Sequence, residues 1–144
     1  MKRILLGLIL IGSFLIADYN RDNNTNIVFD SYSELMWQDE EDITIDIWEN
    51  AIRHCEVLEL GGYSDWRLPN INELFRIVQK SYTKPPRIDK VYFKNTKSSV
   101  YWSSTTNIRY SYPYYAWIVD FEDGNVLSGK KDKTAYIRCV RGGK

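Results

Sequence analysis

The stretch GGYSDWRLPNINEL, residues 61–74, decides how the chain folds on either side of it. Its two glycines can adopt the left-handed conformation that ends a helix. Pro69 followed by Asn70 is typical of a helix start, and Asn70 and Glu73 have the spacing of a capping box. We therefore expect a helix on each side and a sharp turn between them, which is compatible with a catalytic loop or with a structural hinge.

The side chains within this stretch favour the structural interpretation. An arginine fork can bind a carboxylate or several carbonyls at once, so Asp65 and Arg67 can hold an irregular segment in place, while Trp66 and Leu68 can point inward. A catalytic role has little support, because no nucleophile with an adjacent base is visible and the sole histidine falls on a polar helix face. The predicted structural motif comprises Asp65, Trp66, Arg67, Pro69 and Asn70.

Helical periodicity extends the pattern in both directions. Asp46 and Glu49 have capping-box spacing, and an amphipathic helix is predicted over 46–60. Its apolar face consists of Ile47, Trp48, Ala51, Ile52, Cys55 and Leu58. The second helix should start at Asn70 and fade near 80–83, since two prolines follow.

The remaining segments favour strands. Residues 27–38 indicate two short strands joined by a turn, and 99–105, 115–121 and 135–142 have strand character. Residues 122–125 contain Asp-Gly, a strong hairpin signal. Helices grouped between strands indicate a single α+β domain, which suits the length of 144 residues.

The N-terminus has the pattern of a secretory signal peptide over residues 1–17. Two basic residues precede an apolar run that is short for a membrane span, and cleavage after Ala17 is plausible; an uncleaved anchor is the alternative. Residues 18–27 are polar and are predicted to be a flexible lead-in. We expect a secreted or periplasmic protein with no stable membrane span once the signal is removed.

The chain has two cysteines, Cys55 and Cys139. In an exported protein one disulfide is favoured, and a reactive thiol or a metal site is the alternative. With one histidine, a structural zinc site would need carboxylate ligands.

Charge is unevenly distributed along the chain. Residues 34–59 carry nine acidic side chains and one arginine, whereas 80–97 carry six basic side chains and one aspartate. Such a dipolar surface can steer a charged partner, or it can be two solvated faces.

The blocks ELMWQ, WENAIRHCEVLELGGYSDWRLPNINEL, YWSST, AWIVDFEDGNV and YIRCVRGG together resemble the Lcl C-terminal domain family, over residues 28–143. That family is named for the collagen-like adhesin of Legionella, and many members are of unknown function; the collagen repeats are absent here. The resemblance implies a C-type-lectin-like fold, shared with formylglycine-generating-enzyme-like domains. It would have two helices packed on a twisted antiparallel sheet, a long irregular loop region, and a bridge between first helix and last strand.

In lectin-like folds the irregular region, here residues 85–116, presents the ligand-binding surface. It combines basic and aromatic side chains that would suit an acidic or sulfated glycan. The candidate ligand-binding residues are Lys90, Lys94, Lys97, Arg109, Tyr110, Tyr112, Tyr114 and Tyr115. The alternative is that the tyrosines are core or cross-strand residues, the role we assign to Trp102 and Trp117.

Metal and cofactor chemistry is not expected. The acidic group at 120–125 is explained by a hairpin turn, and the calcium-lectin signatures are missing. Copper-dependent oxidation of the formylglycine-generating type would require free cysteines. We therefore expect no cofactor, no catalytic residues and no nucleic-acid partner.

Three functions remain in competition. The leading hypothesis is an exported, non-catalytic binding module for an anionic glycan or a surface protein. The second is a structural or accessory component of a cell-envelope assembly, and the third is a residual enzyme of the formylglycine-generating type.

Overall fold

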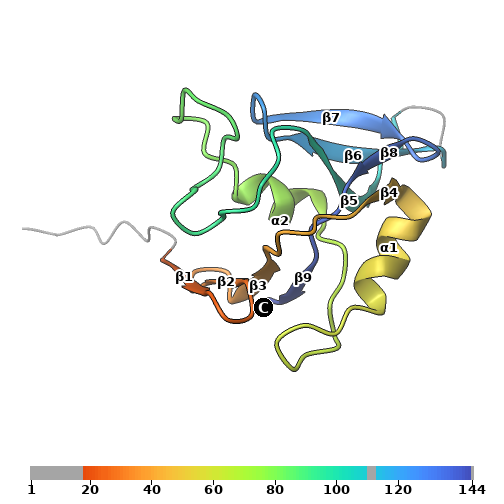
Figure 1. Cartoon of the computed structure of the whole chain (residues 1–144). Coiled ribbons are helices and arrows are strands. Elements are labelled where there is room, and N and C mark those ends of the chain that lie inside the picture. Colours follow the sequence, from red (N-terminus) through yellow and green to blue (C-terminus); the bar gives the residue numbers. More distant parts are fainter. Residues whose placement is uncertain (1–17, 110–112, 144) are drawn as a thin grey trace, which may run out of the picture.

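Two β-sheets and two short helices make up the computed structural model, which describes residues 18–109 and 113–143 (Figure 1). The predicted α+β class is confirmed. Neither described helix is long and apolar enough to cross a membrane. The predicted signal segment lies outside the described residues.

The first sheet has the strand order β1-β2-β3-β9 and is antiparallel throughout. The strands are β1 (Tyr19–Asp22), β2 (Ile27–Asp30), β3 (Leu35–Gln38) and β9 (Val140–Gly142). The two strands expected within 27–38 are present as β2 and β3. The sheet unites both ends of the described chain.

The segment predicted as a flexible lead-in is instead the β1–β2 hairpin. Tyr19 is buried, and its ring meets Phe93 edge-on at 5.3 Å. The Asp22 carboxylate closes the turn by accepting hydrogen bonds from the backbone of Asn24 and the hydroxyl of Thr25. Polar turn residues and one aromatic anchor thus order a segment whose composition resembles that of a linker.

The second sheet has the order β4-β8-β5-β6-β7. Its strands are β4 (Ile45–Ile47), β5 (Val100–Thr106), β6 (Tyr115–Asp120), β7 (Asn125–Lys130) and β8 (Thr134–Tyr136). Strands β5 and β8 are parallel neighbours, and the other pairs are antiparallel. The predicted strands at 99–105 and 115–121 and the hairpin at 122–125 are confirmed.

The single closing strand predicted over 135–142 is wrong. It is divided between β8 in the second sheet and β9 in the first, with residues 137–139 crossing between them. Ile137 N–H donates to Thr44 C=O at 3.0 Å, and Gln38 N–H donates to Cys139 C=O at 3.0 Å. The crossing segment therefore bonds to chain on both sides and joins the two sheets.

Helix α1 covers Trp48–Glu56, which is shorter than the predicted 46–60. The capping box predicted for Asp46 and Glu49 is absent, because Asp46 lies in β4 and no side chain caps the helix. The Asp46 carboxylate instead accepts from the side chain of Asn50 at 3.0 Å. The pairing of β4 with β8 keeps Asp46 in extended backbone, one residue before the N-cap position, which Ile47 occupies.

The two glycines end no helix either. Gly61 and Gly62 both have positive φ and form the tight turn between Leu60 and Tyr63, whose backbones exchange two hydrogen bonds of 3.1 Å.

Helix α2 covers Ile71–Arg76 and begins with the predicted capping box. The Asn70 side chain accepts from Glu73 N–H at 2.9 Å, and the Glu73 carboxylate accepts from Asn70 N–H at 2.9 Å.

The core consists of two groups of buried side chains. One is built around Trp37, Leu74, Phe93 and Tyr101, and the other around Trp66, Trp102 and the two cysteines. Trp102 is buried as expected, whereas Trp117 is half-buried.

Candidate functional site

Residues 61–74 lead from α1 into α2 and are bonded to β9, because the backbones of Arg67 and Val140 exchange two hydrogen bonds of 2.8 Å. The Arg67 guanidinium binds both carboxylate oxygens of Glu73 at 2.8 Å and donates to Gly142 C=O at 3.2 Å. Asp65 does not pair with Arg67, because it accepts two bonds from Arg141, at 2.6 and 3.0 Å. Asp65 and Arg67 thus attach residues 61–74 to β9 by separate hydrogen bonds.

These bonds also set the ionisation of Glu73. Burial acts to raise the pKa of this carboxyl, but hydrogen bonds from Arg67 and from the backbone of Asn70 outweigh it, and the pKa is lowered. Trp66 and Leu68 are buried between these polar residues. This arrangement organises the fold around residues 61–74 and attaches them to β9.

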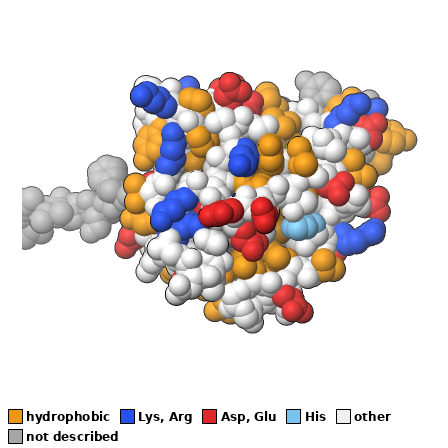
Figure 2. All heavy atoms as spheres, viewed as in Figure 1, with side chains coloured by type: hydrophobic (Ala, Val, Ile, Leu, Met, Phe, Trp, Pro, Cys, Tyr) orange, Lys and Arg blue, Asp and Glu red, His pale blue; other side chains and the backbone are white. Residues whose placement is uncertain are grey.

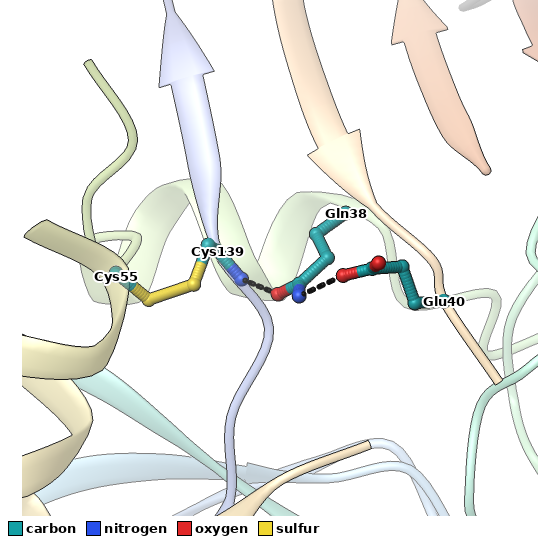
Figure 3. The surroundings of a disulfide bond; sticks show 4 residues. All are labelled: Gln38, Glu40, Cys55 and Cys139. Atoms are coloured by element: carbon teal, nitrogen blue, oxygen red, sulfur yellow. Dashed lines mark hydrogen bonds between the residues drawn. A yellow bond between two sulfur atoms is a disulfide. The ribbon is translucent and has the colours of Figure 1, made fainter. Parts of the chain in front are cut away.

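Cys55 in α1 and Cys139 in the crossing segment form the expected disulfide, with 5.4 Å between their Cα atoms (Figure 3). Cys139 N–H donates to the Gln38 side-chain oxygen at 3.1 Å, and the amide nitrogen of Gln38 donates to Glu40 at 2.7 Å. Both sulfurs are buried, so the bond connects α1 to the junction of the two sheets.

The predicted lysine cluster lies in the connection between α2 and β5, here called the basic loop (residues 80–97). The buried side chains of Ile88 and Phe93 anchor it to the core. Arg87 donates to Tyr82 C=O at 2.7 Å and to Glu122 C=O at 3.2 Å, which secures the loop to the β6–β7 turn. The loop has no regular secondary structure, but its backbone is held at several points.

Asp39 fixes the end of the basic loop. Its fully buried carboxylate accepts the backbone N–H groups of Lys94 at 2.8 Å and Asn95 at 3.2 Å. The same carboxylate pairs with Arg21 and with Arg138, the latter at 2.6 Å. Two arginines and two backbone amides therefore surround the buried charge of Asp39. The sequence alone had placed Asp39 in the acidic run 34–59, for which a solvated surface was one interpretation.

The lysines project outward from this scaffold. Lys90, Lys94 and Lys97 are exposed, and a surface hollow of about 440 Å³ lies between 81–84 and 89–91. In Figure 2, blue side chains gather on the side of the molecule where Figure 1 places the loops between α2 and β5.

The structure does not bring the other candidate residues to the same place. The basic loop precedes β5, whereas exposed Arg109 and Tyr114 follow its far end. Seven strand residues separate the two groups by about 20 Å. Tyr115 is half-buried in β6, and Tyr110 and Tyr112 lie outside the described residues.

Tyr114 instead lies at a groove of about 550 Å³ together with Trp48 and the β7–β8 turn. Sequence reasoning missed this groove, because Trp48 was assigned to the buried helix face. Its position beside the charged run KKD at 130–132 is set by strand pairing, which the linear sequence does not display.

Within residues 18–109 and 113–143, no three His, Cys, Asp or Glu side chains are grouped to hold a metal ion. The acidic hairpin bonds internally: Asp120 accepts from Glu122 N–H, and Asp123 accepts from Asn125 N–H, both at 2.9 Å.

The family model for the Lcl C-terminal domain matches residues 26–141. No curated protein matches the chain.

Proposed function

Because the chain belongs to the Lcl C-terminal domain family, we propose that it is an exported, non-catalytic binding module of lectin-like fold. Its ligand would be an anionic glycan, bound by the basic loop. The observation that carries this proposal is the combination of exposed lysines with a backbone fixed at Asp39, Arg87, Ile88 and Phe93.

A fixed backbone matters for binding. A loop that is already ordered loses less conformational entropy when it binds, so more of the interaction free energy appears as affinity. Lys90 donates one ammonium hydrogen bond to Pro85 C=O and Lys94 donates one to the Asn23 side chain, both at 3.0 Å, so donors of these exposed groups remain for a polyanion with spaced sulfate or carboxylate groups. Lysine acts on such groups as a point charge, without the fixed geometry that a bidentate arginine imposes.

Charge distribution supports an anionic ligand. Between 80 and 97 six basic side chains oppose one aspartate, and Asp89 uses a carboxylate oxygen to accept from Val91 N–H at 3.0 Å. The local excess of positive charge would attract a polyanion over roughly one Debye length, about 8 Å at physiological ionic strength.

Export and the absence of catalysis are parts of the same proposal. A buried disulfide is consistent with an oxidising compartment and with the signal-like segment 1–17. Because both cysteines of the chain are in that bond, neither supplies a thiol for oxidase chemistry. If the signal is cleaved after Ala17, mass spectrometry of the exported protein will find an N-terminus at Asp18.

Heparin chromatography of the mature protein tests the ligand. We expect the wild-type protein to be retained at low salt and to elute when salt is added. Retention should be largely lost in the variant Lys90→Gln, Lys94→Gln, Lys97→Gln. The matched control removes three exposed charges elsewhere, Arg53→Gln, Lys130→Gln and Lys133→Gln, and should elute near the wild type.

Equal losses in the two variants would show only general charge attraction and contradict a site at the basic loop. Absence of retention at low salt would reject the anionic-glycan proposal. Co-purification with one envelope protein in that case would favour a structural or accessory role.

A further inference from the structure

We infer that the groove beside Trp48 and Tyr114 is a second ligand site, and that it binds an uncharged hexose residue of a glycan. Three segments form it: the β4–α1 junction with Trp48 and Glu49, the chain entering β6 at Tyr114, and the β7–β8 turn at 130–132. A volume of about 550 Å³ falls within the range of small-molecule sites.

The groove is held open by bonds among the segments that form it. Trp48 N–H donates to Lys131 C=O at 3.2 Å, and Lys131 N–H donates to Tyr114 C=O at 2.9 Å. The indole N–H of Trp48 is directed to Ser103 C=O at 2.9 Å. The tryptophan is thus fixed in position, and the three segments are bonded to one another.

The walls differ in exposure. Trp48 is half-buried, whereas 64 % of Tyr114 is exposed, an unusual fraction for a large aromatic side chain. Tyrosine presents a flat apolar ring with a hydroxyl at its edge. A pyranose has the complementary surface, with C–H groups on its faces and hydroxyls around its rim.

Charge in the groove argues for an uncharged ligand. Its four ionised side chains comprise two lysines and two acids. Lys130 pairs with Asp132 at 2.9 Å. The Lys131 ammonium lies 3.7 Å from the centre of the Trp48 ring and donates to the hydroxyl of Thr106.

These charges balance, so the groove has no excess of either sign to select an ion. Carboxylates that accept and ammonium groups that donate are nevertheless the partners that sugar hydroxyls require. The groove therefore differs in chemistry from the basic loop, and the inference does not depend on the proposed anionic-glycan site.

Saturation-transfer NMR on the mature protein tests this site with neutral trisaccharides of glucose, N-acetylglucosamine, mannose and galactose. We expect ring C–H protons of at least one to receive saturation. Tyr114→Ala should weaken that binding about tenfold or more, because the exposed ring supplies most of the stacking surface. Asp132→Asn should weaken it less.

Two controls separate this site from the other. Tyr82→Ala removes a partly exposed tyrosine within the basic loop, and the triple lysine variant removes three of the loop's charges; both should bind the trisaccharide as the wild type does. The inference would be overturned if none of the four sugars receives saturation in an experiment that detects a Kd of about 1 mM. Unchanged binding by the folded Tyr114→Ala variant would overturn it as well. Neither result bears on heparin retention, which tests the basic loop separately.

Discussion

Replacing Asp39 by asparagine should lower the free energy of unfolding by about 3–5 kcal/mol, the range for removing one partner of a buried ion pair. The carboxylate is fully buried, and the side chains of Arg21 and Arg138 are 6 % and 2 % exposed. Asparagine keeps one acceptor oxygen but turns an amide toward an arginine, and it leaves two guanidinium groups without their counter-charge. Arg138 is the more severely affected, because it lies 5.3 Å from the ring of Phe93 in the core.

Urea unfolding followed by tryptophan fluorescence measures this loss. With a slope of about 2 kcal/mol per molar, typical of a small domain, the midpoint should fall by about 2 M. Glu41→Gln is the matched control, since it neutralises an exposed acid two residues away and should change stability by no more than about 0.5 kcal/mol.

A midpoint shift for Asp39→Asn that equals the control would refute the reasoning. It would mean that the two arginines are solvated or re-paired in the variant and that the buried charge does not hold the basic loop. A shift of the expected size should be accompanied by weaker heparin retention under folded conditions, because an uncharged side chain replaces the carboxylate to which the amides of Lys94 and Asn95 donate.

Three further changes test the fold. Replacing Cys55 and Cys139 by alanine should cost about 4–5 kcal/mol by the loop-entropy relation for a separation of 84 residues, and urea unfolding of the wild type with and without reductant should show a similar difference. The pKa of Glu73 is lowered from 4.5 in the folded protein, so its carboxylate stabilises the fold above that value and the contribution disappears as the pH falls through the lower folded pKa. The urea midpoint should therefore fall more between about pH 6 and about pH 3 in the wild type than in Glu73→Gln, and parallel curves would contradict this. Gly129→Ala would place a Cβ 2.8 Å from the buried ring of Trp102, so thermal unfolding should show a loss of about 1–3 kcal/mol, and an unchanged melting temperature would contradict the close packing.

Local signals predicted local structure well. The Asn70–Glu73 capping box, the Asp-Gly hairpin and the strands at 100–106 and 115–120 depend on neighbouring residues, and all are present. The disulfide was also expected, because the two cysteines of a chain predicted to be exported have only each other to pair with inside it.

The failures share a physical cause, which is pairing between residues far apart in sequence. Asp46 has the composition of a helix cap, but Ala135 pairs with it across β4 and β8 and keeps it extended. The closing strand is continuous in hydrophobic pattern, yet it changes sheets at Arg138, whose charge is neutralised by Asp39.

The candidate site was recovered only in part for the same reason. Exposure of Lys90, Lys94 and Lys97 follows from their charge, so composition was sufficient to find them. Whether Tyr114 lies beside them depends on the direction of β5, which carries the chain away from the basic loop before Tyr114 is reached. No local pattern contains that information.

The disulfide has a mechanical consequence for a module that is pulled from its two ends. Both ends of the described chain lie in the four-stranded sheet, with β1 and β9 at its opposite edges (Figure 1). Tension at the C-terminal end could separate β9 from its sheet, but extension would stop at Cys139. Tension at the N-terminal end could extend the chain only as far as Cys55. The residues enclosed by the bond, including the basic loop, would be bypassed by the load, but extension of the chain before Cys55 would take Asp39 away from the amides of Lys94 and Asn95 and so release one end of that loop.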